Sequence, residues 1–198
     1  NVFYWDGTSV TTSTNPPKGT LIAAHVGRLW IANVSGTSLI LNASKYNDGT
    51  IWALDTTPTL TSPTQILVKG DENDNITALY PGFKGSMVIF KKNSILLLAG
   101  YDYSDFQIVP VSREIGTIYP ESIQEKDGKL HFYATNKKVY SFDGVNLTWI
   151  SRDIQPTLDT TAQGEETIVT WTQTSASDFG AGTVVNVDTT TIAGSVSL

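Results

Sequence analysis

The sequence contains one hairpin pattern twice, in two places well over a hundred residues apart. The first copy is "NVFYWDGTSVTT" (1–12), and the second lies within "KVYSFDGVNLTWI" (138–150). Each copy has an aromatic-rich run, an Asp-Gly pair and a second short run. Asp-Gly pairs favour the positive φ angles of tight hairpin turns. A hairpin pattern repeated at this distance is typical of a fold made of similar β units.

Four Asp-Gly pairs are predicted to form turns. Two belong to the repeated hairpin, Asp6-Gly7 and Asp143-Gly144, and the others are Asp48-Gly49 and Asp127-Gly128. In each of these turns we expect the glycine to adopt a positive φ, which costs it little because it has no side chain.

A second repeat consists of a glycine followed by an apolar strand. It occurs as "GRLWIAN" (27–33), "GSMVIFK" (85–91) and "GKLHFYA" (128–134). The three glycines are about 58 and 43 residues apart, near the period of roughly 40–50 residues that propeller blades show. Each unit is predicted to be a small antiparallel sheet that buries its apolar faces by stacking on its neighbours.

The whole chain predicts an all-β fold. Short runs rich in Val, Ile, Tyr, Phe and Trp alternate with Gly, Asn, Asp and Pro turns, and helical periodicity is nearly absent. We expect a partial β-propeller of about three antiparallel blades over residues 1–156. "YWDG" is interpreted as the tail of a blade whose earlier strands are missing, so further chain or another subunit would complete the ring. A two-sheet sandwich is the structural alternative.

Residues 157–198 form a Thr/Ser/Gly-rich C-terminal extension with several interpretations. The stretch "SDFGAGTVVNVDTTT" (177–191) resembles segments that precede an added β domain in phage and bacterial surface proteins. The extension could instead be a disordered linker, or a Thr-rich strand exchanged with an adjacent subunit. Trp171, in "ETIVTWTQ" (166–173), is a candidate for contact with a neighbour.

Composition argues against several function classes. The net charge is −6 and the basic residues are scattered, whereas nucleic-acid binding requires clustered Lys and Arg. There is no cysteine, so disulfides and thiolate metal sites are excluded. No apolar run approaches the ~20 residues of a membrane helix. We therefore expect no membrane association and no specific nucleic-acid binding.

The sequence offers no catalytic grouping, so no enzymatic activity and no cofactor are expected. His25 and His131 lie on strand patterns without nearby ligands or nucleophiles, and we interpret both as core or blade-interface residues. Asp102, Asp105 and Glu114 lie between predicted blades, where we interpret them as solvated loop residues. Neither a phosphate-binding Gly loop nor a Ser nucleophile elbow is present.

An acidic run, "GDENDNIT" (70–77), has Asp71, Asn73 and Asn75 at alternate positions. Their side-chain oxygens are ligands that Ca²⁺ prefers. The glycine and the distant glutamate of a Ca²⁺ loop are missing, however, so we interpret the run as a solvated turn between blades and predict no metal site.

Exposed aromatic residues are the best candidates for an interaction site. Tyr101, Tyr103 and Phe106 lie in "GYDYSDF" (100–106), a polar loop. They are expected to contact either a neighbouring subunit or a glycan. Trp30, between Leu29 and Ile31 on a strand, is expected to pack between blades instead.

Residues 76–156 resemble propeller-bearing structural proteins of tailed bacteriophages, notably tail tube, nozzle and stabilisation proteins. With the upstream stretches at 15–33 and 42–52, the resemblance covers about three quarters of the chain. Its motifs are structural. The stretches that carry it are "FKKNSI" (90–95), "EIGTIYPESI" (114–123), "GKLHFYA" (128–134), "VYSFDG" (139–144) and "ISRDIQP" (150–156).

This resemblance implies a non-catalytic structural component of a virion, in the tail tube, nozzle or portal-proximal assembly. Its partners would be other copies of itself and neighbouring virion proteins, and its location the tail or a tail-proximal position. The alternative is a carbohydrate-binding β-propeller module of a surface or host-adsorption apparatus, with a glycan as the ligand.

Overall fold

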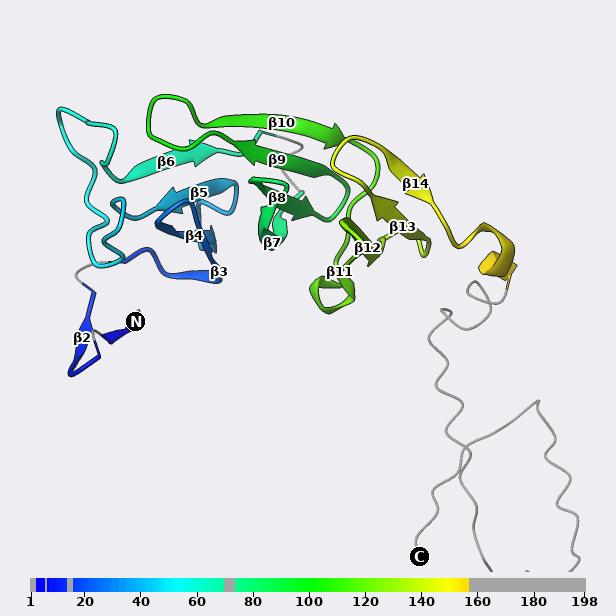
Figure 1. The fold of residues 1–198 in the computed structure, drawn as a ribbon, viewed down its shortest axis with the longest axis horizontal. Helices are drawn as coiled ribbons and strands as arrows, with labels where there is room; N and C mark the ends of the chain where they lie inside the picture. Colours follow the sequence, from blue (N-terminus) through cyan, green and yellow to red (C-terminus); the bar gives the residue numbers. More distant parts are fainter. Residues whose placement is uncertain (1–2, 6, 14–15, 70–73, 157–198) are drawn as a thin grey trace, which may run out of the picture. The chain divides into compact units, whose positions relative to one another are not determined.

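The computed structural model describes residues 3–5, 7–13, 16–69 and 74–156. The chain divides into two compact units, Asn1–Gln155 and Pro156–Leu198. Every strand described belongs to the first unit (Figure 1). The expectations for residues 157–198, including the contact assigned to Trp171, lie outside the described residues.

The prediction of an all-β fold is confirmed. Besides a hairpin, the described strands form three four-stranded antiparallel sheets, each with its strands in chain order. Two short 3₁₀ helices, η1 (Pro120–Ser122) and η2 (Arg152–Ile154), complete the elements. The hairpin consists of β1 (Phe3–Trp5) and β2 (Val10–Thr12); the first sheet of β3 (Gly19–His25), β4 (Arg28–Val34), β5 (Ile40–Ala43) and β6 (Thr64–Leu67); the second sheet of β7 (Ile76–Phe83), β8 (Ser86–Lys91), β9 (Ile95–Ala99) and β10 (Gln107–Ser112); and the third sheet of β11 (Gln124–Lys126), β12 (Lys129–Tyr133), β13 (Val139–Phe142) and β14 (Leu147–Trp149).

The same two-residue turn joins the first two strands of every sheet. Both residues of each turn have positive φ angles, the combination that gives a hairpin a twist matching its strands. The glycines are those of the predicted glycine-strand repeat, so the structure confirms that repeat as a repeated turn. The turns are Val26-Gly27 (φ 43° and 66°), Lys84-Gly85 (49° and 81°) and Asp127-Gly128 (52° and 69°).

The repeated hairpin is confirmed in its register as well. Phe3 pairs with Thr12 and Trp5 with Val10, as Tyr140 pairs with Trp149 and Phe142 with Leu147. Each pair of β1–β2 therefore matches the corresponding pair of β13–β14. The turn glycines also match, because Gly7 and Gly144 both have a φ of 99°. Asp6 lies outside the described residues.

The turn predicted at Asp48-Gly49 is wrong in one respect. The positive φ falls on Asn47, at 54°, and Gly49 is not in the left-handed region. Instead, the Asp48 carboxylate accepts hydrogen bonds from the backbone N–H and the hydroxyl of Thr50. Gly49 is required for close packing, because a Cβ there would lie 2.5 Å from the Leu29 side chain.

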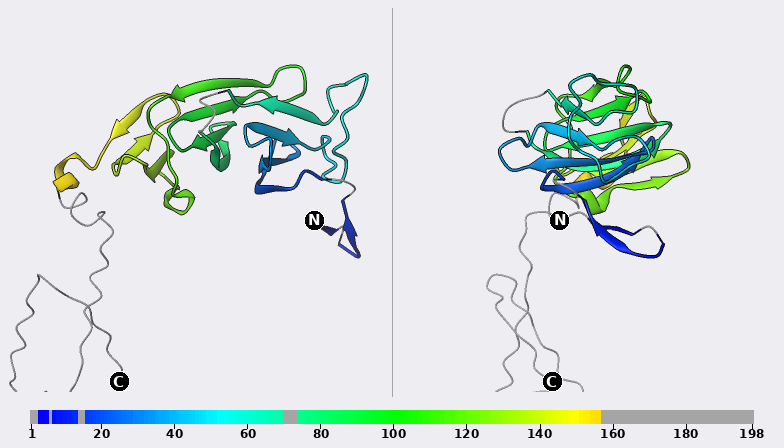
Figure 2. Two further views of the ribbon diagram at one scale, coloured as in Figure 1. Left: turned by 180° about the vertical axis from the view of Figure 1, so that it is seen from behind. Right: turned by 90° about the vertical axis from the view of Figure 1, so that its left-hand side faces the viewer.

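The second sheet is buried on both faces. Neighbouring residues of β8 point to opposite sides of the sheet, and both sides are packed. Met87 and Ile89 pack in a cluster with the first sheet, whereas Val88 and Phe90 pack in a cluster with the third. In the right-hand view of Figure 2 the sheets lie one in front of another. This arrangement differs from the two-sheet sandwich, which buries only one face of each sheet.

The positions that face each neighbour are the same in all three sheets. The second and fourth residues after the turn glycine face the preceding sheet, as Met87 and Ile89 do in the second sheet. Leu130 and Phe132 repeat this in the third sheet. The third and fifth residues face the following sheet. We call the two sides of a sheet its preceding face and its following face.

Phe132→Ala should lower the free energy of unfolding by about 3–5 kcal/mol, because it removes a fully buried ring. The Phe132 ring lies 5.1 Å from that of Phe90 in the second sheet. His131→Ala, on the opposite face of the same strand, should cost less than about 1 kcal/mol. Urea unfolding followed by circular dichroism gives both values, and equal losses would contradict the assignment of the two faces.

Candidate interaction surface

The preceding face of the first sheet carries both apolar and polar side chains, and its central row has no charged residue. One row across it consists of Ile22, Ile31, Asn42 and Gln65, which are paired in register on the four strands. Ile22 is 59% exposed, whereas Ile31 is buried at the centre of the face. Among the described residues, no sheet lies against this face. It is therefore a candidate surface for another protein segment.

The polar side chains of this face bond to one another. Gln65 donates to the Asn42 side-chain oxygen at 2.9 Å, and Asn33 donates to the Thr20 hydroxyl at 2.8 Å. Because these groups already have partners, covering the face would desolvate few unsatisfied polar groups. The cost of stacking a second apolar surface here is accordingly low.

The following face of the third sheet is more polar. Its corresponding row is Gln124, His131, Ser141 and Thr148, all of them polar. The interpretation of His131 as a core or interface residue is not supported in the described part of the chain, because the residue is only half-buried and lies on this face. The two ends of the stack thus present chemically different surfaces.

The β1–β2 hairpin also exposes large apolar side chains. Trp5 and Val10 are opposite each other and are 67% and 68% exposed. Their counterparts in the third sheet, Phe142 and Leu147, pack against the second sheet. In the third sheet β13 also pairs with β12, whereas β1 pairs only with β2 within the described ranges. The hairpin therefore corresponds to the outer half of a four-stranded sheet.

The loop at 100–106 divides its aromatic residues between surface and core. Tyr101 and Tyr103 are 68% and 40% exposed. Phe106, in contrast, is partly buried, with its ring edge-on to Trp30 at 5.1 Å. The exposed aromatic surface predicted for this loop is thus provided by the two tyrosines. Trp30 itself is fully buried between the first and second sheets, which confirms that prediction.

Two carboxylates hold this loop in shape. Asp105 accepts hydrogen bonds from the backbone N–H groups of Tyr101 and Asp102, both at 2.8 Å. Asp102 accepts from the hydroxyl and the N–H of Ser104, and these bonds lower the pKa of Asp102. Both acids therefore act as turn-forming groups, and Glu114 is exposed.

Arg28 fixes the long connection between β5 and β6 beneath this loop. Its guanidinium donates to the carbonyl oxygens of Ser44 at 2.8 Å, Ser62 at 2.7 Å and Leu60 at 2.7 Å. The side chain is buried and lies over the Phe106 ring. Burial lowers the pKa of Arg28, but guanidinium groups remain charged at neutral pH. Sequence reasoning missed this residue, because an arginine after a turn glycine suggests an exposed position.

His25 is buried on the face toward the second sheet, as the sequence predicted. Its carbonyl oxygen accepts a hydrogen bond from the Trp30 indole at 3.0 Å. Burial lowers the pKa of His25, so the imidazole is neutral at pH 7. Its Nε2 atom has no hydrogen-bond partner in the described part of the structure.

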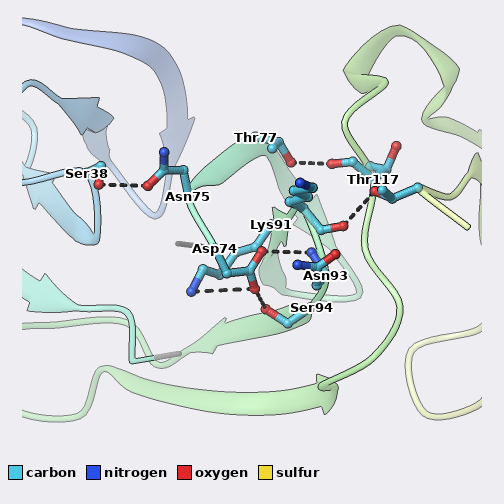
Figure 3. A network of polar contacts seen from close by, with 10 residues as sticks. Ser38, Asp74, Asn75, Thr77, Lys91, Asn93, Ser94 and Thr117 are labelled. Carbon is cyan, nitrogen blue, oxygen red and sulfur yellow. Dashed lines mark hydrogen bonds and ion pairs between the residues drawn. The ribbon is translucent and has the colours of Figure 1, made fainter. Parts of the chain in front are cut away.

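The structure describes only residues 74–77 of the acidic run at 70–77. Asp71 and Asn73 lie outside the described residues. Asp74, which the sequence placed in a solvated turn, is instead buried (Figure 3). Its carboxylate accepts bonds from the Asn93 backbone N–H at 2.7 Å and the Ser94 hydroxyl at 2.6 Å.

Asp74 also pairs with a buried lysine. The Nζ atom of Lys91 lies 3.8 Å from Asp74 Oδ2, and the Lys91 side chain is fully buried. This ammonium has no hydrogen-bond partner among the described residues. A buried ion pair of this kind contributes little net stability, but removing one partner would leave a buried, uncompensated charge. Sequence reasoning missed the pair because both residues lie beside polar turns.

Two further absences hold for the described ranges. No helix in them is long and apolar enough to cross a membrane. They contain no group of three or more His, Cys, Asp or Glu residues arranged to hold a metal ion.

Comparison of the sequence with models of protein families gave no match, and comparison with curated proteins gave none.

The Asp143 turn predicts a measurable pH dependence. Asp143 accepts hydrogen bonds from the N–H groups of Asn146 and Val145, and these lower its pKa from 3.8 to about 2. A carboxylate with a lowered pKa stabilises the fold above its unfolded-state pKa, and this contribution disappears as the pH falls through its folded-state pKa. The turn should therefore weaken between about pH 4 and pH 2.

An NMR titration of the carboxyl carbons should give an Asp143 midpoint near pH 2. Over the same window, Asp143→Asn should lose less thermal stability than the wild-type chain, because the asparagine does not titrate. A midpoint near 3.8 for Asp143, or equal losses in the two proteins, would contradict the assigned hydrogen bonds.

Proposed function

We propose that the chain is a non-catalytic structural component that works by packing its sheets against neighbouring subunits. In this interpretation the three sheets are blades of an incomplete β-propeller, and β1–β2 is the outer half of a further blade. The support is the common stacking plan, in which the same positions of each sheet face the same neighbour.

The observation that carries this proposal is the preceding face of the first sheet, against which no other sheet of the described residues lies. Leu29 and Ile31 occupy the positions that Met87 and Ile89 use to pack against a preceding sheet. The face also carries the exposed Ile22 and has no ionised side chain on its central row. By the plan of the other sheets, this face is suited to another β-sheet with an apolar surface.

The sequence resemblance suggests where such a component acts. Propeller-bearing tail proteins of tailed bacteriophages build rings and tubes from repeated subunits. We accordingly assign the chain to a virion, in the tail or a tail-proximal assembly such as the tube, the nozzle or the portal-proximal region. Its partners there would be copies of itself and neighbouring virion proteins.

Ile22→Asp should prevent assembly, because it places a charge on the face that a neighbour covers. The control is Thr148→Asp, which adds the same charge to an exposed strand position on the polar following face of the third sheet. Light scattering on the purified chains should give a discrete oligomer for the wild type and for the control. Ile22→Asp should give a monomer of 21.5 kDa. A wild type that is monomeric at every concentration would overturn the proposal.

A second candidate function rests on Tyr101 and Tyr103. Exposed aromatic rings on an ordered loop can stack on sugar rings, and hydrogen bonds to Asp105 and Asp102 order this loop. In this interpretation the chain is a carbohydrate-binding module of a surface or host-adsorption apparatus.

Glycan binding should quench or shift the intrinsic fluorescence of the protein as a saccharide is added. Tyr101→Ala and Tyr103→Ala should each weaken this binding, since each removes an exposed ring on which a sugar would stack. Tyr80→Phe serves as a control distant in sequence from the loop. No response across a broad glycan set would rule out the second candidate.

A further inference from the structure

A cavity of about 560 Å³ lies between the first and second sheets, beside β6 of the first and β9 and β10 of the second. This volume falls within the range of small-molecule sites, which is about 300–1,000 Å³. Its apolar wall consists of Ile66 from β6, Leu96 from β9, and Ile108 and Pro110 from β10. No aromatic ring is among the described residues that line it, so the cavity lacks the stacking surface that sugars require.

Two cationic side chains line the same cavity. Lys69 follows β6 and Arg113 follows β10, so the charges come from the two sheets that form the walls. Both residues are exposed. Neither side chain forms an ion pair or a hydrogen bond in the part of the chain that the structure describes. Both guanidinium and ammonium groups are therefore available to an anion.

One carboxylate also lines the cavity, but its charge is compensated. The oxygens of Asp74 accept bonds from Asn93 and Ser94, and Lys91 lies 3.8 Å away. The Asp74–Lys91 pair therefore adds no net charge. Lys69 and Arg113 leave the described lining with two positive charges, although the whole chain has a net charge of −6. The charge of the described lining is thus opposite in sign to the net charge of the chain.

We propose that this cavity binds a small aliphatic carboxylate. Its hydrocarbon chain packs against Ile66, Leu96 and Ile108, and its carboxylate pairs with Lys69 and Arg113. Apolar walls favour the chain because they remove it from water. The guanidinium favours a carboxylate because its N–H groups match the two oxygens. This site is independent of the assembly proposed above, since it uses neither the preceding face of the first sheet nor β1–β2.

The test uses sodium octanoate as the probe and the isoleucine methyl groups as reporters. In an NMR titration of the full chain, octanoate should shift the methyl signals of Ile66 and Ile108 in a saturable manner. The methyl of Ile22, on the opposite face of the first sheet, should not move. Octanol, which lacks the charge, should bind about tenfold more weakly or worse, and octyltrimethylammonium should not bind.

The double variant Lys69→Ala/Arg113→Ala should weaken octanoate binding at least about tenfold while leaving the melting temperature unchanged, since both residues are exposed. Its matched control is Lys126→Ala/Lys129→Ala, which removes two exposed lysines from the third sheet and should leave the affinity as in the wild type. The proposal is overturned if octanoate does not move the Ile66 and Ile108 signals. It is equally overturned if octanol binds as tightly as octanoate, or if both double variants weaken binding to the same degree.

Discussion

The burial of β8 on both sides is the constraint on which the rest of the first unit depends. A strand in which Met87 and Val88 point in opposite directions, both fully buried, cannot lie at the surface of a protein. It requires one apolar sheet on each side, and the clusters around Ile89 and Phe90 show both. The second sheet therefore needs both the first and the third sheet to bury its two faces. Removing either sheet would expose an apolar face to water, which costs a free energy of about 25 cal/mol per Å² of apolar surface.

Hydrophobic stacking has no preferred direction, so other contacts must fix how the sheets meet. Between the second and third sheets this is done by the segment around Thr117. Its N–H donates to the Lys91 carbonyl oxygen at 2.9 Å, and its own carbonyl oxygen accepts from the Thr77 hydroxyl at 2.6 Å (Figure 3). Its hydroxyl donates to the Tyr133 carbonyl oxygen at 2.6 Å. The approach is close enough to require a glycine next to it. A Cβ on Gly116 would lie 2.2 Å from the Lys91 carbonyl oxygen.

The parts of the fold that could be predicted from sequence are those that a few neighbouring residues determine. The glycine turns and the repeated Asp-Gly hairpin depend on local φ preferences, and both were found where the sequence placed them. Gly49 shows the limit of this reasoning. Its role comes from packing against Leu29, which the turn pattern cannot indicate.

Charged residues mark the second limit. Arg28, Asp74 and Lys91 suggest exposed positions in the sequence, yet all three are buried. Each is stabilised by partners on other strands or loops, such as the carbonyl oxygens around Arg28, and no local pattern specifies those partners. The candidate cavity was not predicted for the same reason, since its lining comes from separate segments of two sheets. Only the aromatic loop at 100–106 was identifiable beforehand, and even there Phe106 packs toward the core.

The same stacking plan explains both the tight core and the cavity. The inner strands β3 and β7 contact each other, so the first and second sheets are close where their first strands meet. The cavity, in contrast, is lined by the later strands β6, β9 and β10. The first and second sheets touch along their first strands and enclose a space beside their last strands. They are therefore farther apart at the last strands than at the first. Ile66 and Ile108 line this space and are only partly buried. Between the first and second sheets, a packed centre therefore coexists with a cavity beside the last strands.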